Sequence, residues 1–73
     1  MYVSNLIVLW INEKNGNGIC TDNSGNECYV DSSIRGFEQL KRKDIVSGAI
    51  DRIGGVLCVR SLNTKYNSDT ILK

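Results

Sequence analysis

Residues 16–31 read Gly16-Asn17-Gly18-Ile19-Cys20-Thr21-Asp22-Asn23-Ser24-Gly25-Asn26-Glu27-Cys28-Tyr29-Val30-Asp31. Two short runs rich in apolar and β-forming side chains stand on either side of a cluster of Asn, Ser and Gly. Such runs are typical of half-buried strands, and such a cluster is typical of a tight turn. The stretch therefore predicts a β-hairpin with strands at residues 16–22 and 27–31.

Further strands flank this hairpin. Before it, residues 3–12 are rich in β-branched and apolar side chains and end at turn-forming residues. After it, residues 32–43 are polar and basic, which predicts a long loop that holds at most one helical turn. Residues 44–52 and 56–62 then read as two more strands joined by a tight turn.

The chain has 73 residues, which is room for one small domain. Five strands with a long connection between the third and the fourth predict an all-β fold, a five-stranded antiparallel Greek-key barrel of the oligonucleotide-binding type. We assign the barrel to residues 1–62 and a polar tail to residues 63–73. The alternative is a three-stranded sheet with a helix over residues 37–43. The side chains expected inside the barrel are Val8, Val30, Ile45 or Val46, Ile50 and Val56.

Charge and composition narrow the function classes. Nine Lys and Arg against eight Asp and Glu give a formal net charge of +1. This is far from a strongly basic balance, so nucleic-acid binding depends on where the charges lie. The chain has no histidine, the commonest general base and metal ligand, which excludes His-based triads. We therefore expect no enzyme activity, no metal site and no cofactor.

The three cysteines, Cys20, Cys28 and Cys58, form no Cys-x-x-Cys pair and stand in apolar or alternating runs. This pattern favours buried, unreactive thiols, with a disulfide or a redox role as the alternative. The apolar run at residues 6–11 is too short to span a bilayer and lacks the flanks of a signal peptide. We expect a cytoplasmic protein with no membrane partner.

A resemblance to a known family covers about residues 3–62. The run Trp10-Ile11-Asn12-Glu13-Lys14-Asn15-Gly16-Asn17-Gly18-Ile19-Cys20 resembles the first ribonucleoprotein motif of the bacterial cold-shock domain, Trp-Phe-Asn-x-x-Lys-Gly-Phe-Gly-Phe-Ile. Residues 28–34 are similar to the second motif, Val-Phe-Val-His-Phe-Ser-x-Ile, with one residue deleted after Asp31, and residues 36–40 to the family's Gly-Phe-Lys-x-Leu. The resemblance implies a barrel that binds single-stranded RNA or DNA in gene regulation, without catalysis.

The same resemblance implies a set of contact residues. Aromatic side chains would stack on bases, and basic side chains nearby would contact phosphates. The resemblance implies the aromatics Trp10, Tyr29 and Phe37, and to these we add, as our own expectation from the remaining basic residues, Lys14, Arg35 and Arg60. Each aromatic also has a structural alternative. Trp10 would pack at the barrel end, Tyr29 would cover the sheet, and Phe37 would anchor the long loop to the core.

Several positions depart from the family pattern. Asn17 and Ile19 stand where the family has phenylalanines, Asn15 replaces a lysine, and Asp31 replaces a histidine. A stacked base is worth about 1–3 kcal/mol, and a carboxylate repels the phosphodiester chain. We therefore expect weak binding of nucleic acid.

Ile7 and Leu9, which stand where the family has lysines, favour a second function. They predict an exposed apolar strip beside Trp10. The alternative is thus a protein-interaction module that keeps the barrel and binds a second copy of itself, as a homodimer, or another protein there. The basic run at residues 41–43 fits either solvated surface or contact with phosphates or an acidic partner.

Overall fold

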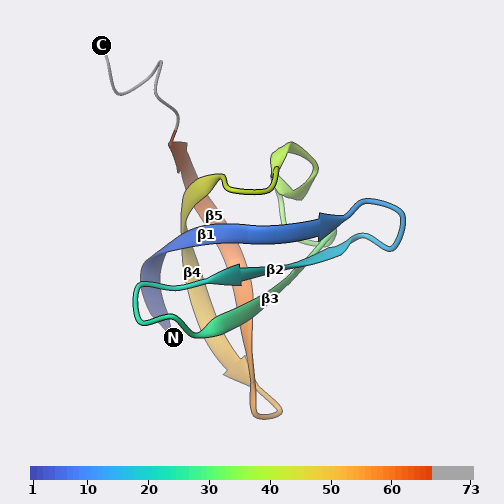
Figure 1. Ribbon diagram of the computed structural model, residues 1–73. Coiled ribbons are helices and arrows are strands. Elements are labelled where there is room, and N and C mark those ends of the chain that lie inside the picture. Colours follow the sequence, from blue (N-terminus) through green and yellow to red (C-terminus); the bar gives the residue numbers. More distant parts are fainter. Residues whose placement is uncertain (67–73) are drawn as a thin grey trace.

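The computed structural model describes residues 1–66, and side chains for residues 1–63. Within this range the chain forms five strands and one short 3-10 helix (Figure 1). The elements are β1 (Tyr2–Asn12), β2 (Asn17–Thr21), β3 (Glu27–Asp31), η1 (Phe37–Gln39), β4 (Ile45–Ile53) and β5 (Val56–Tyr66). None of the helical structure in this range is long and apolar enough to cross a membrane.

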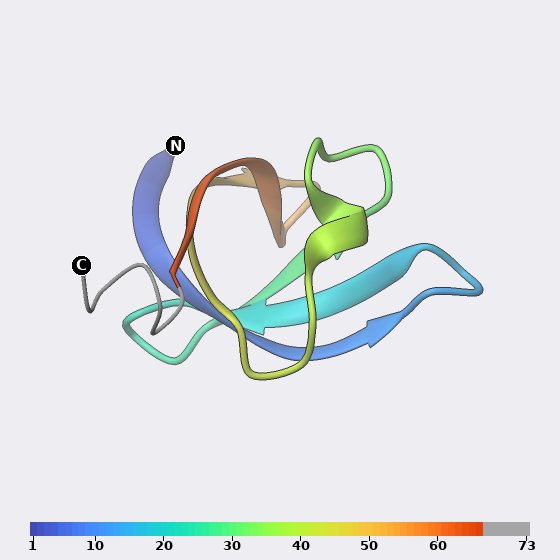
Figure 2. The ribbon, with the colours of Figure 1, turned by 90° about the horizontal axis from the view of Figure 1, so that it is seen from above.

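The strands close into a barrel in the order β1-β2-β3-β5-β4 (Figure 2). The all-β class, the five strands and the β2–β3 hairpin are confirmed, and the alternative of a three-stranded sheet with a helix is wrong. The expectation that all strands are antiparallel is also wrong, because β3 and β5 pair in parallel through Tyr29 and Cys58. Around a closed ring, strand directions alternate throughout only when the number of strands is even, so five strands require one parallel pair.

The long connection between β3 and β4 holds a single turn, η1, as expected. The last strand is longer than expected, because β5 continues to pair with β4 as far as Tyr66. The predicted polar tail, residues 63–73, therefore begins inside β5, and its residues 67–73 lie outside the described part of the chain.

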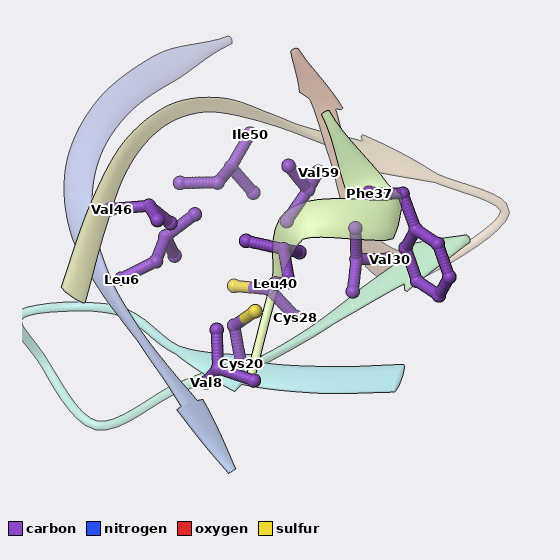
Figure 3. Close-up of a cluster of buried hydrophobic side chains, with 10 residues drawn as sticks. All are labelled: Leu6, Val8, Cys20, Cys28, Val30, Phe37, Leu40, Val46, Ile50 and Val59. Carbon is purple, nitrogen blue, oxygen red and sulfur yellow. The ribbon is translucent and has the colours of Figure 1, made fainter. Parts of the chain in front are cut away.

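A cluster of buried apolar side chains from all five strands and η1 fills the barrel (Figure 3). Its members are Leu6, Val8, Cys20, Cys28, Val30, Phe37, Leu40, Val46, Ile50 and Val59. Four of the interior residues expected from the sequence are among them, with Val46 rather than Ile45 facing inward. Burying a Val, Leu or Ile side chain contributes about 1.5–3 kcal/mol, so this cluster is the main source of stability.

Val56 is 54% exposed, which corrects its expected place in the interior. The pairing of β1 with β4 ends at Tyr2 and Ile50, so beyond Ile50 the β4–β5 hairpin has no β1 strand beside it. Val56 lies near the tip of that hairpin, where no opposing layer covers it. Val59, which pairs with Ile50, takes the interior position instead.

Gly18 allows the strands at one end of the barrel to approach closely. A Cβ atom at this position would lie 2.6 Å from Ile11 Cδ1 and 2.6 Å from the Trp10 carbonyl oxygen. Contacts this short are not tolerated, so the missing side chain is a packing requirement.

Asp22 joins the start of β1 to the β2–β3 turn. Its Oδ1 accepts hydrogen bonds from the backbone N–H groups of Ser24 (2.9 Å) and Asn26 (2.8 Å). Its Oδ2 accepts one from the Tyr2 hydroxyl at 2.7 Å and one from the Asn26 side-chain amide at 3.1 Å. The bond from Tyr2, more than the bonds from Asn26 and Ser24, lowers the pKa of Asp22 from 3.8 to about 2, although burial acts the other way.

The depressed pKa of Asp22 predicts acid sensitivity. A carboxyl group whose pKa is lower in the folded state contributes stability that is present above its ordinary pKa of 3.8 and is lost as pH falls through about 2. Urea unfolding at a series of pH values should show the free energy of unfolding falling across this window. The fall should be smaller in Asp22→Asn and unchanged in the control Glu13→Gln. An equal fall in Asp22→Asn would contradict the assignment.

Candidate nucleic-acid interface

Trp10, Ile19 and Tyr29 occupy one cross-strand row on the outside of the barrel. Trp10 of β1 pairs with Ile19 of β2, and Ile19 pairs with Tyr29 of β3. The row ends at Cys58 of β5, the parallel partner of Tyr29. Trp10 is 46% exposed, and the other three side chains are half-buried. The structure therefore brings two of the three predicted stacking aromatics into one line, with an isoleucine between them.

A β-bulge turns Trp10 outward. Leu6 and Val8 point into the barrel, and a regular strand would place Trp10 on that same inner face. The register of β1 against β2 shifts between Val8 and Trp10, which adds one residue to β1 at that point. As a result Trp10 faces solvent, and Ile11 packs against the core.

Phe37 does not belong to this row. Its ring is 6% exposed and is part of the core cluster, at one end of the cluster in Figure 3. Phe37 therefore offers a base much less surface than Trp10 does, and its stacking role stays a prediction. The structural alternative, in which Phe37 anchors the long loop to the core, is the arrangement observed.

Lys14 and Phe37 instead line an open pocket of about 530 Å³ at the end of the barrel. Its apolar part is formed by Ile11, Phe37 and Leu40. Two acidic residues, Glu13 and Glu38, also line it, together with Lys14, Asn15, Gly16 and Ser32. The two carboxylates beside the single lysine make this pocket a poor site for a phosphate group.

The two predicted arginines lie in different places. Arg60 is exposed on β5, two residues beyond Cys58, which puts it level with Asp31 on the outer face. Arg35 is exposed in the loop after β3 and lines a smaller hollow beside Leu62. Only Arg60 thus borders the row of Trp10 and Tyr29.

Asp31 has a structural role that its sequence position did not reveal. Its Oδ1 accepts a hydrogen bond from the Ser33 backbone N–H at 3.0 Å and another from the Ser33 hydroxyl. These bonds fix the first turn of the loop after β3. The carboxylate is nevertheless only half-buried and stands two residues along β3 from Tyr29, where it adds negative charge beside the row.

Ile19 is a candidate contact residue that the comparison with the family pattern does not reveal. It stands where the family has a phenylalanine, and it lies at the centre of the row, between Trp10 and Tyr29. Its position could have been inferred from the alternation of β2, in which Gly18 and Cys20 face inward and Ile19, between them, faces outward. An isoleucine offers apolar contact to a base although it cannot stack.

The three cysteines are free. Cys20 and Cys28 are buried and lie opposite each other in β2 and β3, and Cys58 is half-buried. Burial, more than the neighbouring Cys28, raises the pKa of the Cys20 thiol to about 11. Burial also raises the pKa of Cys28. Within residues 1–63, no group of three or more Cys, Asp or Glu side chains lies close enough to hold a metal ion.

Comparison with known proteins adds no family assignment, because no protein-family model and no curated protein matches the chain. The fold and the site define the protein as a small closed β-barrel that carries Trp10, Ile19 and Tyr29 in one row on its outer surface.

The thiols should differ in reactivity because the thiolate is the reactive form. In the native protein an aromatic disulfide reagent should modify Cys58 first. Cys20 and Cys28 should react only at the rate of unfolding, because burial both shields them and raises the pKa of each. In Cys58→Ser the fast phase should disappear. Three equally fast thiols would contradict the buried placement.

Proposed function

We propose that the protein is a non-catalytic binding module for single-stranded RNA or DNA, with an oligonucleotide-binding barrel of the cold-shock type. The observation that carries the proposal is the outer row of Trp10, Ile19 and Tyr29 across three adjoining strands. Stacking on aromatic side chains is the sequence-tolerant way in which such barrels hold single strands. The strand order β1-β2-β3-β5-β4 is consistent with this type of barrel.

The charges around the row support weak binding. Lys14 is exposed in the loop that follows β1, and Arg60 borders the row on β5. Asp31 lies level with Arg60 on the neighbouring strand β3, and its negative charge opposes these two positive charges. With few phosphates neutralised, affinity should depend only shallowly on salt. Contact would then come mainly from the rings, and a role in gene regulation in the cytoplasm is part of this proposal.

A protein-interaction role is the second candidate. The observation that favours it is the exposure of Ile7 and Leu9, which follow each other on the outer face of β1. Apolar side chains gathered on one exposed face are typical of interaction sites. This role needs neither Trp10 nor Tyr29, so the two candidates make separable predictions.

Binding of a single strand should quench the fluorescence of Trp10, the only tryptophan. Titration with a labelled oligothymidylate or oligouridylate should show this quenching at low salt. Trp10→Ala and Tyr29→Ala, followed by anisotropy of the labelled strand, should each lose about 1–3 kcal/mol of binding free energy. The control Val56→Ala, at the hairpin tip, should bind as the unaltered protein does. Absence of quenching by both RNA and DNA would exclude this function.

Removing the charge of Asp31 should strengthen binding. Asp31→Asn keeps the oxygen that accepts the bonds from Ser33 and removes the repulsion of phosphate. The affinity for oligothymidylate should increase a few-fold at low salt and less at high salt. Glu38→Gln, which removes a carboxylate outside the row, is the control. Equal effects of the two substitutions would show that net charge, rather than position, governs binding.

A further inference from the structure

An apolar strip lies on the outer face of β1 and β4 and begins next to Trp10, because Leu9 directly precedes Trp10 in β1. We define it by Ile7, Leu9 and Ile45. Ile7 and Ile45 are direct partners in the β1–β4 pairing and are 47% and 45% exposed. Leu9 follows Ile7 on the same strand and is also exposed. Three large aliphatic side chains are thus adjacent on one surface.

A basic turn adjoins this strip. The backbone of residues 43–44 is bonded to β1, because Lys43 N–H donates to the Val8 carbonyl at 2.8 Å and Val8 N–H donates to the Asp44 carbonyl at 2.9 Å. The turn itself is closed by Lys41 N–H, which donates to Asp44 Oδ2 at 2.7 Å. The side chains of Lys41, Arg42 and Lys43 are exposed, and none forms an ion pair within residues 1–63. The turn that carries these three exposed cations therefore lies against β1 at Val8, the residue between Ile7 and Leu9.

From this juxtaposition we propose that the apolar strip and the basic turn together form a docking surface for an acidic amphipathic helix of a partner protein. The apolar stripe of the helix would cover Ile7, Leu9 and Ile45, and its carboxylates would face residues 41–43. The inference is independent of nucleic-acid binding and gives the second candidate function a partner of defined chemistry.

The geometry favours a helix over an added strand. At the strip β1 has no free edge for strand addition, because Ile7 pairs with Thr21 of β2 and Ile45 of β4, and Val8 is bonded to the backbone of residues 43–44. Ile7 and Leu9 are two residues apart on a strand, which corresponds to about 7 Å. Residues four apart on a helix advance by about 6 Å, so successive apolar side chains of one helical stripe can meet both.

The charges favour an acidic partner over a second copy or a single strand. A second copy would bring the same three cations into the interface, and three partly exposed side chains supply much less than the roughly 800 Å² per partner of a stable dimer. A nucleic acid would meet aliphatic side chains, which offer no ring for stacking. An acidic helix matches both the apolar and the basic part of the surface.

The test uses the full chain and a labelled synthetic peptide with Leu at every i, i+3, i+4 and i+7 position and Glu at the other positions. A matched peptide with Lys in place of Glu is the control for charge. Fluorescence anisotropy should show that the protein binds the acidic peptide and does not bind the basic control peptide. The double variant Ile7→Thr, Ile45→Thr should weaken it by about tenfold or more, and Lys41→Glu with Arg42→Glu should weaken it and reduce its salt dependence.

Two matched variants lie outside the surface. Ile53→Thr changes an equally exposed isoleucine at the β4–β5 hairpin, and Lys14→Glu reverses a charge elsewhere, so both should bind the acidic peptide normally. The charge variants change exposed turn residues, so they test the surface even where the threonine variant folds poorly.

Three results would overturn the proposal. The first is failure of the acidic peptide to bind, or equal binding of the basic one. The second is a dimer in sedimentation that Ile7→Thr dissociates, which would assign the strip to a second copy. The third is that the protein binds phosphatidylserine vesicles but not the peptide, and that the same variants abolish vesicle binding. This would assign the surface to an anionic membrane.

Discussion

The structure depends on the closure of a ring of five strands. Strands in an odd-numbered ring cannot all run opposite to their neighbours, so one adjacent pair must be parallel. In this protein the parallel pair is β3 and β5, which meet at Tyr29 and Cys58. A parallel pair needs a long crossover between its strands, and here the chain crosses through η1 and β4. Within this crossover, the loop between β3 and β4 supplies Phe37 and Leu40 to the core.

The strand pairings also determine what the outer surface presents. They bring outward side chains that are distant in the sequence into rows across neighbouring strands. One such row joins Trp10, Ile19 and Tyr29, and the pair of Ile7 and Ile45 belongs to another. The first is suited to flat bases and the second to aliphatic side chains. Two binding functions are thus compatible on one barrel, because they use different rows.

The sequence predicted most of the fold from local patterns. The β3 bounds, the β2–β3 hairpin and the single turn of η1 follow from alternation and from clusters of Gly, Asn and Ser. The parallel pair was missed because it is a property of the closed ring and leaves no local pattern. Val56 was misplaced for a similar reason, since β-branched character does not reveal that a hairpin tip extends past the strand that would cover it.

The site was only partly predictable. Trp10 and Tyr29 could be identified as candidate contact residues, but the bulge that turns Trp10 outward leaves no signal in residues 6–11, which are all apolar. Phe37 has an aromatic side chain that could stack on a base, but it lies among the buried side chains of the core. Asp31 was interpreted by its charge alone, although its bonds to Ser33 also shape the loop. Tertiary contacts of this kind decide which way a side chain faces and what it binds, and they leave no local pattern in the sequence.

The most direct test of the central claim, that β3 and β5 close the barrel and that the bulge in β1 turns Trp10 into the outer row, is a nuclear Overhauser spectrum of the protein in solution. The expected result is a contact between the backbones of Tyr29 and Cys58, together with contacts from the Trp10 indole to Ile19 and none to Val30 in the core. Contacts from the indole to core residues, or the absence of the contact between Tyr29 and Cys58, would contradict it.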